Sequence, residues 1–166
     1  MVTTARLHPD IRGYRSPDDQ DKTFEIFQAA IRQTASQVYT PGQVDAWAGI
    51  GPRPADMSDW DSRRRRAFTL VAEVDDTVVG FADLLPDGLV DMLFVDPRAG
   101  GRGVARALLT SIKGEARARG IPELRTLASR SAQPAFERLG FTITAERPDN
   151  TVRGVVVPNA EMRCVL

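Results

Sequence analysis

The sequence predicts one α+β domain in which a sheet of about seven strands is layered with about four helices. Three observations support this prediction. The chain has 166 residues, of which 42% are hydrophobic, so it is the size of one domain with a sizeable core. Apolar or β-branched runs alternate with stretches of helical spacing. No repeat, low-complexity tract or dividing linker interrupts residues 1–166, so we expect a single domain over that range.

Three stretches have the boundary residues and the spacing of helices. Pro17 and Pro41 stand where proline favours a first helical turn, and apolar residues follow each of them at largely helical spacing. Gly120 ends the longest pattern, which starts after a glycine-rich turn. These helices are expected at residues 17–31, 41–48 and 103–119, and residues 59–66 form a further helical segment.

Apolar or β-branched runs mark the strands. Two of them flank Asp75-Asp76-Thr77 and predict an antiparallel hairpin. The turn Pro86-Asp87-Gly88 leads into the next strand, which ends at Asp96-Pro97 because proline cannot donate to a strand ladder. The expected strands lie within residues 5–14 and at residues 68–74, 78–84, 89–95, 123–128, 142–147 and 152–165.

The junction after the strand at 89–95 is the most informative stretch. The turn Gly100-Gly101-Arg102-Gly103 follows Asp96-Pro97, and a helix opens at Val104-Ala105. Glycines let the backbone approach a phosphate, successive N–H groups point at it, and the helix dipole adds partial positive charge. This turn therefore predicts a binding site for a phosphorylated cofactor.

Two well-known phosphate-binding motifs fit this turn poorly. A P-loop needs Lys-Ser/Thr after its last glycine, but Val104 and Ala105 follow Gly103. A Rossmann fingerprint needs a third glycine where Arg106 stands, and the unit is not at the start of the chain.

The segment GGRGVARALL resembles the pyrophosphate-binding motif of the GNAT superfamily of N-acetyltransferases, Q/R-x-x-G-x-G/A. In this register Gly103 and Ala105 match the later positions, and Gly100 stands where the family has Gln or Arg. That departure removes one side-chain contact and leaves the backbone cradle intact. A register that starts at Arg98 also matches the letters, but it misplaces the start of the helix.

A second block strengthens the resemblance. After the strand at 123–128, residues 135–141 (AFERLGF) are similar to the family block F-Y-E-x-x-G-F, which ends a short helix. The stretches 39–48, 91–95 and 129–134 resemble a bacterial branch of the superfamily more closely, and the likeness covers roughly residues 5–165. It implies a mixed, mostly antiparallel central sheet and acetyl-CoA as the cofactor.

The resemblance also implies where acetyl-CoA binds. In the family, the strand before the cradle splays from its neighbour, and its main chain holds the pantetheine and the thioester. Residues 93–95 should then hold the acetyl end, and residues 100–106 the pyrophosphate. The implied cofactor-binding residues are Leu93, Phe94, Val95, Gly100, Gly101, Arg102, Gly103, Val104, Ala105, Arg106, Ser129 and Phe136.

The transfer needs a base for the amine but no covalent enzyme intermediate. Asp91 is the first candidate, because a two-residue period places it on one face with Leu93 and Val95, and a carboxylate in an apolar strand is costly unless it is satisfied or useful. Asp91 could instead cap a turn or pair with an arginine. Asp83, on the neighbouring strand, is a weaker candidate that would act through water.

The proton donor and the acceptor site are less well defined. Many GNAT enzymes use the tyrosine of the second block as an acid, but Phe136 stands there, so thiolate protonation would come from solvent. Ser129 could hydrogen-bond CoA or cap a helix. The first two helices cover the acceptor side in the family, and this implies Tyr39, Thr40 and Trp47 as substrate-binding residues, although a tryptophan at this helical spacing is more often a core residue.

Composition excludes several classes of function. With 22 basic and 22 acidic residues, the chain has no general attraction to nucleic acid or to anionic membranes. The arginine run 63–66 has no interleaved aromatics and suits the end of a helix. One cysteine, Cys164, and one histidine, His8, argue against a metal site and against Ser-His or Cys-His catalysis. The sequence has no signal segment and no apolar run of about 18 residues, so we expect a cytoplasmic protein.

These inferences predict an acetyl-CoA-dependent N-acetyltransferase that acts on a primary amine of a small molecule or peptide by direct attack. The alternatives are a non-catalytic acyl-CoA-binding or sensor domain, which the missing tyrosine favours, and a nucleic-acid-binding module built on the arginine run. Homodimers, often formed through the late strands, are frequent in the family, and the resemblance leaves that state open for this chain.

Overall fold

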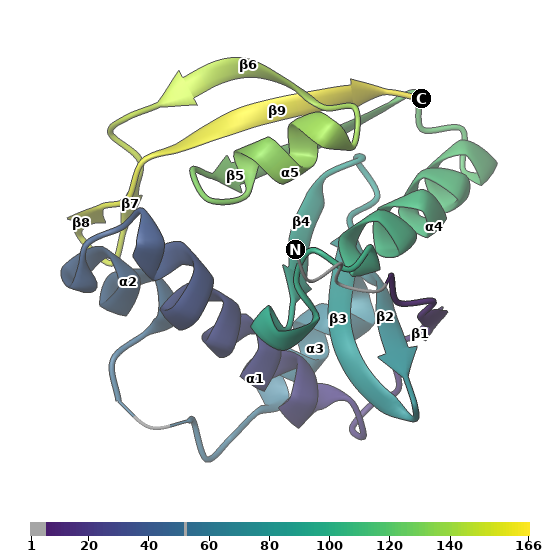
Figure 1. Cartoon of the computed structure of the whole chain (residues 1–166), viewed down its shortest axis with the longest axis horizontal. Helices are drawn as coiled ribbons and strands as arrows, with labels where there is room; N and C mark the ends of the chain where they lie inside the picture. The colour runs from purple at the N-terminus through teal and green to yellow at the C-terminus, as the bar shows by residue number, and fades with distance from the viewer. Residues whose placement is uncertain (1–5, 52) are drawn as a thin grey trace.

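A computed structural model of the chain describes residues 6–51 and 53–166 (Figure 1). The strands are β1 (Asp10–Gly13), β2 (Phe68–Val74), β3 (Thr77–Leu84), β4 (Val90–Val95), β5 (Glu123–Ser129), β6 (Thr142–Arg147), β7 (Thr151–Val152), β8 (Val155–Val156) and β9 (Asn159–Val165). The α-helices are α1 (Gln20–Ala29), α2 (Pro41–Ala48), α3 (Ser58–Arg66), α4 (Val104–Ala118) and α5 (Gln133–Arg138). Three shorter helical turns are the π-helical η1 (Ala30–Thr34), which continues α1, and the 3-10 turns η2 (Ala35–Gln37) and η3 (Pro97–Ala99).

The strands form two main antiparallel sheets that open away from each other (Figure 1). The first has the order β1-β2-β3-β4, and the second has the order β5-β9-β6. They meet at one end, where Leu89 forms a parallel bridge with Arg125 and the Arg125 N–H donates to the carbonyl of Gly88 at 3.0 Å. The Thr126 hydroxyl adds a bond to the carbonyl of Val90 at 3.0 Å. Beyond Val90, no backbone pairing in the described residues joins β4 to β5.

One hydrophobic core runs beneath both sheets and holds them together. α4 covers one face of the first sheet, where Gly80 has no side chain and so leaves room for Val104 and Leu108. The core includes Leu84, Leu108, Ile112, Leu124 and Met162, which come from β3, α4, β5 and β9. On the other face of the first sheet, Ile26 of α1 packs against Val71 and Phe81.

The predicted α+β fold is confirmed, and the helical segment expected at residues 59–66 lies within α3. The expected strand at 152–165 is wrong as a single element, because Arg153 and Gly154 turn the chain with φ of 47° and 79° and Pro158 cannot donate. That stretch is divided into the end of β7, β8 and β9. In the described part of the chain, no helix is long and apolar enough to cross a membrane.

A substitution at Gly88 tests whether the junction of the two sheets depends on the close approach of the Gly88 and Glu123 backbones. Its φ is 85°, and an added Cβ would lie 2.6 Å from the carbonyl oxygen of Glu123. We therefore expect Gly88→Ala to lower the free energy of unfolding by about 1–3 kcal/mol. Gly114→Ala is the matched control, because Gly114 lies inside α4 with open space around it, so alanine should stabilise by about 0.5–1 kcal/mol. Urea denaturation of both variants measures these changes, and equal effects would contradict the prediction.

Candidate active site

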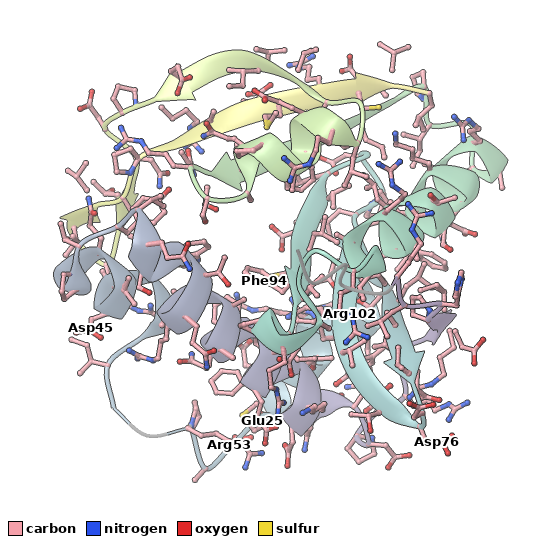
Figure 2. All side chains as sticks on the ribbon, viewed as in Figure 1. Glu25, Asp45, Arg53, Asp76, Phe94 and Arg102 are labelled. Carbon is pink, nitrogen blue, oxygen red and sulfur yellow. The ribbon has the colours of Figure 1, made fainter. Side chains whose placement is uncertain are left out.

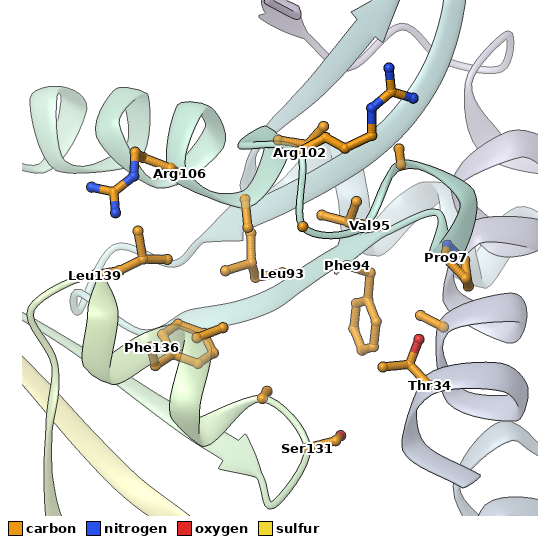
Figure 3. Close-up of a pocket in the computed structure, with 18 of the residues that line it drawn as sticks. Thr34, Leu93, Phe94, Val95, Pro97, Arg102, Arg106, Ser131, Phe136 and Leu139 are labelled. Atoms are coloured by element: carbon orange, nitrogen blue, oxygen red, sulfur yellow. The ribbon is translucent and has the colours of Figure 1, made fainter. Parts of the chain in front are cut away.

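A cleft of about 760 Å³ lies between the diverging strands and the helices around them (Figure 3). Its walls come from β4, the loop before α4, the start of α4, the end of β5, α5, η1 and the end of α2. All twelve residues that the resemblance assigns to cofactor binding line this cleft: Leu93, Phe94, Val95, Gly100, Gly101, Arg102, Gly103, Val104, Ala105, Arg106, Ser129 and Phe136. The structure therefore brings together two blocks that are separated in the sequence.

The glycine-rich turn leaves the N-terminal end of α4 open to the cleft. Asp96 fixes the start of the turn, because its carboxylate accepts the Arg98 N–H at 2.9 Å. Gly101 and Gly103 then adopt φ of 70° and 95°, a region that side chains disfavour. Gly103 is the N-cap of α4, and no side chain caps this helix. The first N–H groups of α4 are consequently available to an anion.

The charge of the lining suits a polyanionic ligand. Four arginines line the cleft, and no carboxylate occurs among its described lining residues. Arg102, Arg106 and Arg138 come from the cradle loop, α4 and α5. Arg6 comes from the N-terminal segment, where the Leu7 N–H donates to the carbonyl of Arg102 at 2.9 Å. An added Cβ on Gly103 would lie 3.4 Å from the Arg6 side chain, so this glycine lets the segment pass close to the cradle.

Strand β4 separates the aliphatic and aromatic parts of the site. Leu93 and Val95 pack with the core on the α4 side and also line the cleft. Phe94 lies on the α1 side of β4, and Arg102 lies beside the start of α4 (Figure 2). The Phe94 ring centroid is 5.1 Å from that of Phe27 and 6.3 Å from that of Trp47.

The two candidate carboxylates lie outside this cleft. Asp83 pairs with Met92 while Leu84 pairs with Val90, so Asp91 stands at a bulge with no residue opposite it. A bulge interrupts the two-residue alternation and turns side chains in new directions. Asp91 is exposed and does not line the cleft, although Leu93 and Val95 do.

Asp83 is buried in an ion pair with Arg64. Its side chain is 1% exposed, one oxygen lies 2.8 Å from the Arg64 Nε, and the other accepts the Thr69 hydroxyl at 2.8 Å. Burial raises the pKa of Asp83 to about 6, although Arg64 and Thr69 act in the opposite direction. Arg64 also stacks on Trp60, with its guanidinium carbon 4.4 Å from the ring centroid.

Known proteins are similar to this chain in sequence and in fold. Residues 36–164 match the family described as the acetyltransferase (GNAT) domain. The chain belongs to the GNAT acetyltransferase family. It is 40% identical over 155 residues to the uncharacterized N-acetyltransferase YafP of Escherichia coli K12, and the match spans 92% of this chain and 93% of that protein.

Solved GNAT structures agree with the fold. A GCN5-related N-acetyltransferase from Rhodopseudomonas palustris superimposes with a TM-score of 0.89 at 30% identity, over 98% of this chain and 99% of that one. The protein yncA from Salmonella typhimurium, whose structure contains acetyl-CoA, has a TM-score of 0.69 at 23% identity over 96% and 95% of the two chains. The likeness to yncA concerns the fold. The predicted GNAT fold and acetyl-CoA-dependent N-acetyltransferase activity are confirmed, and the sensor alternative is not favoured.

The second GNAT block lies along the cleft as expected. The Ser129 hydroxyl lies 3.0 Å from that of Ser131 and accepts the Ala132 N–H at 3.3 Å, so Ser129 supports the turn into α5 while it faces the cleft. Phe136 is buried against Phe141, with ring centroids 5.1 Å apart. In the described part of the chain, no group of three or more histidine, cysteine or acidic residues could hold a metal ion.

The three residues expected on the acceptor side of this GNAT protein have different surroundings. Only Trp47 lines the cleft. Tyr39 is 5% exposed, and its hydroxyl donates to the carbonyl of Pro158 at 2.6 Å and accepts the Arg130 N–H at 2.9 Å. Thr40 forms a capping box with Gln43 at the start of α2. Sequence reasoning missed Arg6 because a single arginine near the N-terminus carries no motif.

The buried pair predicts a pH-dependent loss of stability. Arg64→Met leaves the Asp83 carboxylate buried without its cation, so we expect it to lower the free energy of unfolding by about 3–5 kcal/mol at about pH 8. The pKa of Asp83 is raised to about 6, so this carboxyl is protonated at about pH 5, and the loss should be smaller there. Arg63→Met is the control, because Arg63 is exposed in the same helix. Urea denaturation at both pH values measures the losses, and a loss independent of pH would contradict this account.

Proposed function

We propose that this protein transfers the acetyl group of acetyl-CoA to a primary amine of a small molecule or peptide by direct attack. The observation that carries the proposal is the cleft itself, which combines an uncapped helix N-terminus, four arginines and an unpaired edge of β4. A diphosphate suits the first two features, because they supply N–H donors and positive charge.

Each part of the cleft has a distinct task in this proposal. The N–H groups that follow Gly103 and the guanidinium groups bind the pyrophosphate, and Ser129 hydrogen-bonds CoA. On the side facing β5, the main-chain groups of residues 93–95 have no strand partner, so they can bond the pantetheine amides and orient the thioester. Acetyl-CoA supplies an acyl thioester that an unprotonated amine can attack.

Asp91 is our proposed acceptor for the proton of the amine. Its exposed side chain lies outside the cleft, so water carries the proton between them. Both oxygens of Asp83 are taken by Arg64 and Thr69, and we therefore assign Asp83 to holding β3 against α3. With Phe136 in place of the family tyrosine, the thiolate takes its proton from solvent.

Release of CoA thiol from acetyl-CoA, measured with a panel of alkyl, aromatic and polyamine substrates, tests the proposed function. We expect thiol release that equals the acetylated amine formed. Calorimetry of CoA binding is measured on the same preparation. Tight CoA binding without turnover of any amine would instead support an acyl-CoA sensor.

Gly103→Ala tests the cradle. Alanine at a φ of 95° is strained by about 1–2 kcal/mol, so the turn should move away from the geometry that presents its N–H groups. We expect about a tenfold loss of CoA affinity by calorimetry. Gly114→Ala, in the same helix, should bind CoA like the parent protein. Equal affinities in the two variants would place the pyrophosphate elsewhere.

Asp91→Asn tests the proposed proton acceptor. We expect kcat to fall about tenfold to a hundredfold, with the KM for acetyl-CoA unchanged, because Asp91 does not line the cofactor cleft. Asp76→Asn, on the exposed turn between β2 and β3, is the control. An unchanged kcat, or an equal loss of cofactor affinity, would remove Asp91 from this role.

A further inference from the structure

The cleft has a second end, away from Arg106 and the first turn of α4. Figure 3 shows Thr34 and Ser131 at the end opposite Arg106. Ala30, Ala35 and Trp47 also line the cleft, and we call these five residues the indole end: Ala30, Thr34, Ala35, Trp47 and Ser131. Because the cradle binds the pyrophosphate in the proposed function, the indole end remains for the acceptor amine.

Two aromatic neighbours hold the Trp47 indole ring in position at this end. Its ring centroid is 6.0 Å from that of Tyr39 and 6.3 Å from that of Phe94. Two hydrogen bonds of Tyr39, to Pro158 and Arg130, keep that neighbour in place. The Trp47 side chain is only partly buried, although its neighbours pack against it, so part of the indole is left for a ligand.

The hydrogen bonding of the two tryptophans differs. The Nε1 group of Trp60 donates to the Thr23 hydroxyl at 3.0 Å. The corresponding group of Trp47 has no hydrogen-bond partner within residues 6–51 and 53–166. Buried or half-buried tryptophans usually find such a partner.

Small side chains from η1 and the residue after it line the same end of the cleft. α1 continues as the π-helical turn η1, in which Ile31 is fully buried and Ala30 and Thr34 line the cleft. Ala35 follows directly and lines it too. Such π-helical turns are rare and often occur at functional sites. These small side chains take up little of the space at the indole end.

The charges are confined to the cradle end. The ionisable residues among the described lining residues are the four arginines, whereas the indole end is apolar apart from two hydroxyl groups. A second ammonium group on an acceptor would therefore lie without a carboxylate partner, at a high desolvation cost. An uncharged aromatic ring can stack on the indole face instead.

We propose that the acceptor is a primary monoamine that carries an uncharged aromatic ring, and that the ring stacks on Trp47. This inference rests on the proposed function. In the transfer, the amine nitrogen forms a bond to the acetyl carbon and the carbon–sulfur bond breaks. The proton lost by the amine passes through water to Asp91, and the thiolate of CoA takes a proton from solvent.

The chain offers a direct test because Trp47 and Trp60 are its two tryptophans. Trp60→Phe leaves Trp47 as the single indole fluorophore, and Trp47→Phe leaves Trp60 as the matched control. Each variant is saturated with CoA, which cannot transfer an acetyl group, and phenethylamine is added. Thermal melts check that both variants fold.

We expect a saturable change in the emission of Trp47, with a midpoint within about threefold of the KM for phenethylamine, and no change in Trp60. Trp60 lines a second cleft of about 960 Å³ beneath the loop that precedes α3. A change in the emission of Trp60 but not of Trp47 would place the amine in that second cleft and overturn the proposal.

Steady-state kinetics provide an independent readout. We expect kcat/KM for phenethylamine to exceed the values for hexylamine and spermidine by about tenfold or more, and Trp47→Ala to raise the KM for phenethylamine about tenfold. A preference for spermidine, or an unchanged KM in Trp47→Ala, would overturn this inference while leaving the acetyltransferase function intact. Ring binding at Trp47 without turnover of any amine would instead contradict the proposed function alone.

Discussion

The single junction between β4 and β5 determines the rest of the site. Leu89 and Arg125 join the sheets at one end, and the shared core beneath them prevents full separation. Beyond Val90 the edge of β4 has no strand partner in the described residues, so its main-chain groups must bond water or a ligand. An extended chain such as pantetheine can replace the missing strand. The same divergence creates the cleft into which α5 and η1 project.

The charge of the cradle is supplied by the tertiary structure as well as by the motif. Gly100 offers no side chain where the family motif has Gln or Arg. Arg6 and Arg138 reach the same cleft from the N-terminal segment and from α5, and each adds a guanidinium group that the motif does not encode. Because the backbone N–H groups act locally and the arginines act over several ångströms, the loss of one side chain leaves an anion site in place.

Local features were predictable from the sequence, and features that depend on pairing were not. The glycine turn and the helix after it are local, and the cofactor residues predicted there line the cleft. The places of Ser129 and Phe136 followed from the resemblance to the second GNAT block. The bulge at Asp91 depends on how β4 registers with β3, and no pattern within β4 reveals it. The burial of Arg64 depends on Asp83, and the sequence run indicated only a helix end. The π-helical turn follows an ordinary helical pattern, and nothing within that pattern distinguishes it.

No carboxylate occurs among the described residues that line the cleft, and deprotonation of the acceptor amine does not require one there. An ammonium group that enters the apolar indole end loses hydration and is disfavoured in its charged form. Desolvation therefore lowers the pKa of the amine, so much of the deprotonation accompanies binding. A base inside the cleft would also repel the diphosphate of the cofactor. A carboxylate outside it, such as Asp91, can accept the proton through water without weakening cofactor binding.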